Sequence, residues 1–164
     1  MSTTGEELDE LDGIVIPGGE SSVIDKLARA FGMQQPIRDA ISGGLPVYGT
    51  CAGLILLADR ITDGIRGQET FGGLDVTVRR NAFGGQVESF ETDVEIEGIT
   101  GGHPMRAVFI RAPWVESVSP DVEVLARVPS GPAAGRIVAE LRGNDINEKN
   151  VVYAATTGGG ADGG

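Results

Sequence analysis

The fold of this chain is centred on the run Leu45-Pro46-Val47-Tyr48-Gly49-Thr50-Cys51-Ala52-Gly53-Leu54. An apolar segment, a turn of small residues and a second apolar segment predict a short strand that leads directly into a helix. This is the pattern of a nucleophile elbow, where a sharp strand-to-helix turn lifts a reactive side chain clear of the sheet. Backbone N–H groups beside that residue can hold an oxyanion. Cys51, the only cysteine, is therefore the candidate nucleophile; the alternative is an ordinary buried core cysteine.

A cysteine that transfers acyl groups needs a base, and histidine is the usual one. The chain contains one histidine, His103, in the segment Gly101-Gly102-His103-Pro104. That setting is most simply a surface loop, and no spacing rule ties it to Cys51. The sequence thus offers a nucleophile without an obvious partner.

Composition limits the classes of protein to consider. A chain of 164 residues suits a single domain with its own core. The net charge of −11 argues against nucleic acid as a partner. No apolar run approaches the ~20 residues of a membrane helix, and the polar, acidic start is unlike an export signal. One cysteine allows no internal disulfide and fits a reducing cytoplasm.

No cofactor or metal is expected either. One cysteine and one histidine, far apart in the sequence, do not form a ligand cluster. The pair Gly18-Gly19 lacks the further glycine spacing of a nucleotide-binding loop.

The first half of the chain predicts alternating strands and helices. Gly13–Ile16 is an apolar strand that ends at Pro17-Gly18-Gly19, and Glu20-Ser21-Ser22 supplies the start of a helix to about Phe31. In that helix four apolar residues fall at helical spacing on one face: Val23, Leu27, Ala30 and Phe31. The next predicted elements are a helix over Gln35–Ser42, the elbow strand over Pro46–Tyr48 and a helix over Ala52–Ile61.

The second half predicts mostly strands, over Leu74–Arg80, Val87–Ile96, Ala107–Arg111, Val122–Val128 and Arg136–Leu141, the last two as a closing pair. Strand–helix–strand units followed by strands indicate an α/β protein with a mixed sheet. We expect one domain over residues 1–143. Residues 144–164 form a divergent, glycine-rich tail that is expected to be disordered.

Four motifs carry a more specific resemblance. They are Pro17-Gly18-Gly19-Glu20-Ser21, the Gly49–Leu54 elbow, the stretch Val76–Phe90 with its Arg79-Arg80-Asn81-Ala82-Phe83-Gly84 segment, and Val108-Phe109-Ile110-Arg111-Ala112-Pro113. In this order they resemble the class I, triad-type glutamine amidotransferases, in particular the glutaminase subunit of pyridoxal 5′-phosphate synthase. The resemblance covers about Leu8 to Gly143. It implies a flavodoxin-like mixed sheet.

The resemblance also implies a function. Such a subunit hydrolyses L-glutamine through a cysteine thioester and passes the ammonia to a synthase subunit for vitamin B6 biosynthesis. Cys51 would then be the nucleophile, with the amides of Gly19 and Ala52 as oxyanion donors. Glutamine would be bound by Gly19, Glu20, Ser21, Arg80, Ile110 and Arg111. An arginine fork suits a carboxylate, and a glutamate suits an ammonium group.

Two departures from that family lead to further expectations. The family has a β-α-β unit ahead of the segment that matches Leu11–Pro17, and it ends with a His-x-Glu segment that completes the triad; neither pattern is found here. We therefore expect a chain truncated at both ends, with impaired catalysis. A non-catalytic module that binds glutamine or the synthase is the alternative. A redox-responsive Cys51 with Glu20 as its neighbour ranks third.

Overall fold

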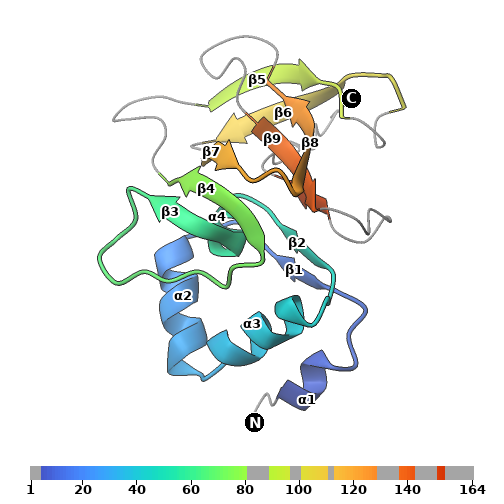
Figure 1. Cartoon of the computed structure of the whole chain (residues 1–164). Coiled ribbons are helices and arrows are strands. Elements are labelled where there is room, and N and C mark those ends of the chain that lie inside the picture. The colour runs from blue at the N-terminus through green and yellow to red at the C-terminus, as the bar shows by residue number, and fades with distance from the viewer. Residues whose placement is uncertain are drawn as a thin grey trace, which may run out of the picture.

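A computed structural model describes residues 5–80, 89–96, 101–110, 113–128, 137–142 and 151–153 (Figure 1). The helices are α1 (Gly5–Leu8), α2 (Ser21–Ala30), α3 (Gln34–Ser42) and α4 (Ala52–Leu57). The strands are β1 (Ile14–Ile16), β2 (Val47–Gly49), β3 (Ala58–Thr62), β4 (Leu74–Arg79), β5 (Ser89–Val94), β6 (Met105–Ile110), β7 (Trp114–Val118), β8 (Val122–Arg127), β9 (Ile137–Arg142) and β10 (Val151–Tyr153). Within these ranges no helix is long and apolar enough to cross a membrane.

The two parallel pairs come from the strand–helix half of the chain. β1 pairs with β2 in parallel, with Ile14 opposite Val47 and Ile16 opposite Gly49. β3 pairs with β4 in parallel as well. The crossover from β1 to β2 contains α2 and α3, as parallel pairing requires.

Antiparallel pairing dominates the rest of the sheet. The order β10-β9-β7-β4-β3 forms one path, and β8 pairs with β9 beside it. The predicted closing pair is thereby confirmed as β8 and β9. β5 and β6 form a separate antiparallel pair, from Ser89 opposite Ile110 to Val94 opposite Met105. The expected α/β class with a mixed sheet is confirmed.

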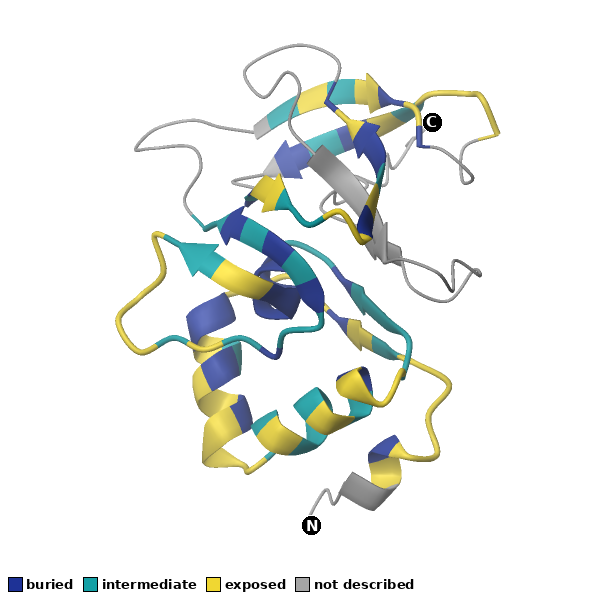
Figure 2. Ribbon diagram, in the orientation of Figure 1, coloured by how far each residue is buried: buried dark blue, intermediate teal, exposed yellow. Residues whose placement is uncertain are grey.

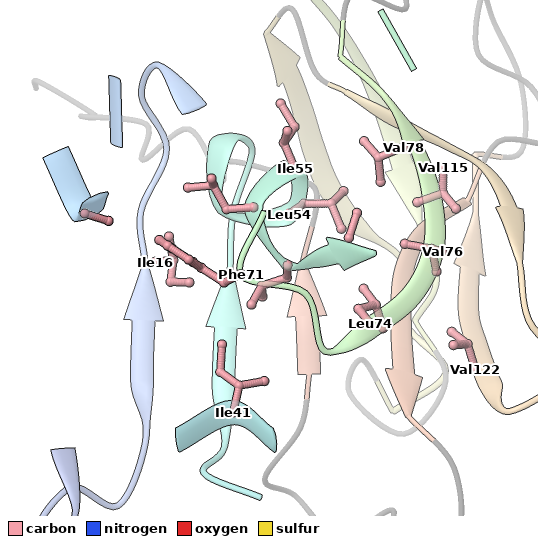
Figure 3. Close-up of a cluster of buried hydrophobic side chains, with 14 residues drawn as sticks. Ile16, Ile41, Leu54, Ile55, Phe71, Leu74, Val76, Val78, Val115 and Val122 are labelled. Carbon is pink, nitrogen blue, oxygen red and sulfur yellow. The ribbon is translucent and has the colours of Figure 1, made fainter. Parts of the chain in front are cut away.

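The main core surrounds α4 (Figure 3). Every residue of α4 is buried, and its Leu56 is fully enclosed. β4 alternates buried and half-buried positions, so that Leu74, Val76 and Val78 face this core. A second cluster lies around Val94, Phe109 and Val128. The elbow helix is thus the most deeply enclosed element among those described.

Helix α2 has the opposite orientation to the one that its apolar spacing indicates. Val23, Leu27 and Phe31 are 48%, 51% and 76% exposed. Figure 2 shows exposed positions along α2. The buried positions are instead Ser21, Ser22, Asp25 and Ala28. The physical reason is that the buried polar groups find partners there: Asp25 accepts hydrogen bonds from Arg29 at 2.8 and 3.0 Å and from the amide of Glu69 at 3.1 Å.

Some predicted boundaries were wrong. The helix expected over Ala52–Ile61 ends at Leu57, because Ala58 is extended and residues 58–62 pair with β4 as β3. β7 was not foreseen. Val151–Tyr153, inside the tail expected to be disordered, pairs with β9 as β10; residues 143–150 and 154–164 lie outside the described part.

Candidate active site

Cys51 occupies a strained backbone position between β2 and α4. Its φ of 51° and ψ of −103° place a residue with a Cβ in the positive-φ region. Such outliers cost of order 1–3 kcal/mol and persist only where the surrounding structure enforces them. Cys51 is half-buried, in contrast to the fully enclosed helix that follows it. The elbow predicted from the sequence is therefore formed, and its thiol is not a core residue.

Two glycines make this turn possible by letting backbone segments touch. A Cβ on Gly53 would lie 2.2 Å from the carbonyl oxygen of Ile16 in β1. A Cβ on Gly49 would lie 2.8 Å from the carbonyl carbon of Gly53. Both distances are shorter than any real Cβ contact. The spacing Gly-x-Cys-x-Gly is thus a packing requirement of the elbow.

The loop after β1 lies against the elbow. A Cβ on Gly18 would be 3.5 Å from the Cβ of Cys51, and the amide of Thr50 donates to the carbonyl of Ile16 at 3.1 Å. Gly19 has a φ of 145°, which favours glycine. The predicted oxyanion donors belong to these two segments, because Ala52 directly follows Cys51 and Gly19 directly follows Gly18.

Glu20 and Arg80 form an ion pair next to this loop. The Arg80 side chain is 12% exposed and that of Glu20 is 55% exposed. Burial raises the pKa of Glu20, but the Ser22 hydroxyl, which donates at 3.1 Å, and the Arg80 guanidinium outweigh it and lower that pKa overall. Glu20 is two residues from Gly18, so their Cα atoms are at most about 7 Å apart. The structure therefore places Glu20 and Arg80, two of the six predicted glutamine ligands, next to the Gly18–Gly19 loop that lies against Cys51.

The hydroxyl of Ser21 is held by a residue from another part of the chain. Ser21 is 1% exposed, and its Oγ accepts a hydrogen bond from Nε2 of Gln68 at 2.9 Å. Sequence reasoning missed Gln68, because it lies in a polar connection with no motif. Its side-chain oxygen is buried and has no hydrogen-bond partner among the described residues.

Three other residues are less informative. Ile110 ends β6, but its side chain is not described, and Arg111 lies outside the described residues. His103 is exposed, two residues before β6. This agrees with a loop histidine. Among the described residues no group of histidine, cysteine and acidic side chains could hold a metal ion.

The structure thus places a cysteine at a strained strand-to-helix turn, beside a glycine loop, in an α/β fold. The chain belongs to the SNO glutamine amidotransferase family, whose sequence model matches residues 2–148.

Curated relatives carry a more specific name. Two of them are called pyridoxal 5′-phosphate synthase subunit PdxT: the protein from Acidothermus cellulolyticus, 62% identical over 138 residues, and that from Leifsonia xyli subsp. xyli, 64% identical over 139 residues. These alignments cover 84% and 85% of this chain, and 66% and 68% of the relatives. The chain therefore spans about two thirds of the length of these relatives.

One solved structure agrees with the family assignment, and a second shares the fold. A crystal structure described as a glutamine amidotransferase matches with a TM-score of 0.77 and 39% identity, over 93% of this chain and 74% of that one. A Thermoplasma acidophilum protein described as a component of GMP synthase matches with a TM-score of 0.58 and 17% identity, over 94% of this chain and 67% of that one. The second match concerns the fold alone.

Proposed function

We propose that this chain is the glutaminase subunit of a pyridoxal 5′-phosphate synthase and hydrolyses L-glutamine to glutamate and ammonia. The observation that carries the proposal is the strained Cys51 elbow with the Gly18–Gly19 loop against it. The family name supports glutamine as the substrate, and the name of the curated relatives supports a pyridoxal 5′-phosphate synthase as the complex.

In the proposed reaction the Cys51 thiolate attacks the side-chain carbonyl carbon of glutamine. The tetrahedral oxyanion is held by the amides of Ala52 and Gly19. The carbon–nitrogen bond then breaks, ammonia leaves with the proton that the thiol gave up, and a glutamyl thioester remains. Water hydrolyses the thioester to glutamate and restores the thiol.

Glu20 and Arg80 would bind the amino-acid end of the substrate. The guanidinium can hold the α-carboxylate through two parallel hydrogen bonds, and the Glu20 carboxylate can accept from the α-ammonium. In the free chain the two side chains satisfy each other. Bound glutamine would therefore replace the Arg80–Glu20 ion pair by an Arg80–carboxylate contact and a Glu20–ammonium contact. The largely buried Arg80 would have a charged partner both before and after binding.

The partner that we propose is the synthase subunit, which would receive the ammonia and use it in vitamin B6 biosynthesis. The reaction needs no cofactor, since sulfur, carbonyl and water supply all the atoms. A reducing cytoplasm suits it, because the mechanism requires a free thiol.

We further propose that catalysis by this chain is slow, because its only histidine, His103, is exposed in a loop. Loss of a general base typically lowers a rate by about 10²–10⁴-fold. Added imidazole should then accelerate ammonia release in the intact chain and leave Cys51→Ala unaffected. No acceleration would contradict the proposed lack of a base.

The proposed function is tested by following ammonia release from glutamine with the synthase subunit present. Release should depend on Cys51 and vanish in Cys51→Ala, with His103→Ala as a control that keeps the full rate. Equal release by the intact chain and by Cys51→Ala would refute the cysteine mechanism. Calorimetric binding of glutamine without release would favour the non-catalytic alternative.

A further inference from the structure

The connection between β3 and β4 contains seven consecutive residues, 67–73, that we call the strap. Each of them is hydrogen-bonded to a neighbouring helix or to β3. Three hydrogen bonds join the strap to α2: Arg29 donates to the carbonyl of Gly67 at 3.2 Å, Gln68 donates to Ser21 at 2.9 Å, and the amide of Glu69 donates to Asp25 at 3.1 Å. Arg38 of α3 donates to the carbonyl of Thr70 at 2.9 Å. The amides of Phe71 and Gly72 donate to the carbonyl of Leu56 in α4 at 2.7 and 3.2 Å, and the amide of Gly73 donates to Asp59 in β3 at 2.9 Å.

These contacts connect the two elements that carry the site. The strap contacts Ser21, the first residue of α2, which directly follows Glu20. It also contacts Leu56 in α4, the helix that begins directly after Cys51. One short segment therefore fixes the Gly18–Glu20 loop and the elbow to a common support.

The outer face of α2 offers no such support. Val23 and Leu27 are exposed on it, and Phe31 is exposed directly after the helix. The inner face combines polar and apolar contacts: Ile24 and Ala28 pack on the main core, while Ser21, Asp25 and Arg29 contact the strap. The strap hydrogen bonds therefore add to the packing of Ile24 in holding the first turn of α2.

We propose that the strap positions the oxyanion loop, Gly18–Glu20, against Cys51, and that Gln68 is the positioning residue that does so, through Ser21. This inference rests on the proposed glutaminase function only for its catalytic consequence. The buried side-chain oxygen of Gln68 has no partner among the described residues. Burying such an oxygen is unfavourable. The Nε2 of the same amide donates to Ser21 Oγ at 2.9 Å and so links the strap to the start of α2.

The test replaces Gln68 by methionine, which keeps the length and removes the amide. The matched control is Gln35→Met, because Gln35 donates to Asp39 on the exposed side of α3 and does not contact the strap. Hydrogen exchange measured by mass spectrometry over residues 17–24 reports on the loop directly. In Gln68→Met these amides should exchange about tenfold faster, while those of α3 stay unchanged.

The kinetic readout separates positioning from general stability. With the synthase present, Gln68→Met should lower kcat for glutamine about tenfold with KM within about twofold, since a misplaced oxyanion donor acts in the transition state. The unfolding midpoint should fall by at most about 4 °C, because removal of the unpartnered Gln68 oxygen partly offsets the cost of leaving the buried Ser21 hydroxyl without its donor. Gln35→Met should match the intact chain in all three measurements.

Unchanged exchange over residues 17–24 would overturn the proposal, and so would faster exchange with an unchanged kcat. If the intact chain itself released no ammonia, the proposed function would fail, and the exchange experiment alone would decide whether the strap holds the loop. Should Gln68→Met not fold, Ser21→Ala breaks the same hydrogen bond from the other side and must give the same exchange pattern.

Discussion

At the scale of single residues, Arg80 is largely buried and forms an ion pair with Glu20 in the Gly18–Glu20 loop. Its neighbour Arg79 is 43% exposed and pairs with Glu116 and Asp63. The two arginines are adjacent in the sequence and point to different environments. They allow the same substitution to be compared at a candidate ligand and at a surface position.

Arg80→Lys should raise KM for glutamine about tenfold, because an ammonium cannot hold a carboxylate through two parallel hydrogen bonds. Steady-state kinetics with the synthase present measure this change. Arg79→Lys is the matched control and should keep KM, since exposed ion pairs contribute little. Equal effects of the two substitutions would remove Arg80 from the site.

The lowered pKa of Glu20 gives a pH prediction. Because the folded pKa lies below the ordinary value of 4.5, the ion pair stabilises the fold above pH 4.5 and is lost as the pH falls through the folded value. Ser22→Ala removes one cause of the lowering. An NMR titration should show the pKa of Glu20 rising toward its ordinary value in this variant; an unchanged pKa would contradict the assigned contact.

At the scale of elements, the elbow depends on the close approach of α4 to β1. Gly53 lies within a helix, where alanine is favoured over glycine by about 1 kcal/mol. A steric clash opposes the higher helix propensity of alanine, because a Cβ on residue 53 would lie 2.2 Å from the carbonyl oxygen of Ile16. An overlap with backbone cannot be relieved by a rotamer change, so the steric term wins.

Gly53→Ala should therefore lower the free energy of unfolding by about 3 kcal/mol or more. Gly64→Ala is the control, because its Cβ would meet Ile61 at 3.4 Å, an ordinary contact, and should change stability by less than about 0.5 kcal/mol. Chemical denaturation measures both. A stable Gly53→Ala variant would show that β1 and α4 do not approach so closely.

The elbow, the glycine loop and the order of strands and helices up to α3 were predictable, because glycine and apolar runs constrain the backbone locally. The orientation of α2 was not predictable from spacing, since it follows from the partners that Asp25 and Ser21 find in the strap. The end of α4 was missed for a similar reason: residues 58–62 leave the helix to pair with β4. Long-range hydrogen bonds overrode local preference in both places.

At the scale of the whole molecule, β2 connects the two hydrophobic clusters. Val47 packs against the cluster around α4, and Tyr48 packs against the cluster around Phe109. In the second cluster Phe90 stacks on Phe109 with ring centroids 4.7 Å apart. The strand that presents Cys51 is thus fixed from both sides.

Burial raises the pKa of Tyr48 above its ordinary value of 10.0. Its neutral form therefore stabilises the fold fully below pH 10.0, and this contribution is lost as the pH rises through the raised pKa. Tyr48→Phe should lose less stability than the intact chain above pH 10, as followed by circular dichroism during alkaline unfolding. Identical alkaline unfolding curves for the two proteins would show that ionisation of Tyr48 does not contribute to the loss of stability above pH 10.

The central claim is that Cys51 forms a covalent bond to the glutamyl group of glutamine. The protein can be incubated with glutamine in the presence of its synthase partner, quenched with acid and digested, and the peptide that contains Cys51 followed by mass spectrometry. The account predicts a glutamyl adduct on Cys51 that disappears on treatment with hydroxylamine and is absent from Cys51→Ala. Ammonia release with no adduct on Cys51, and at the same rate in Cys51→Ala, would contradict it.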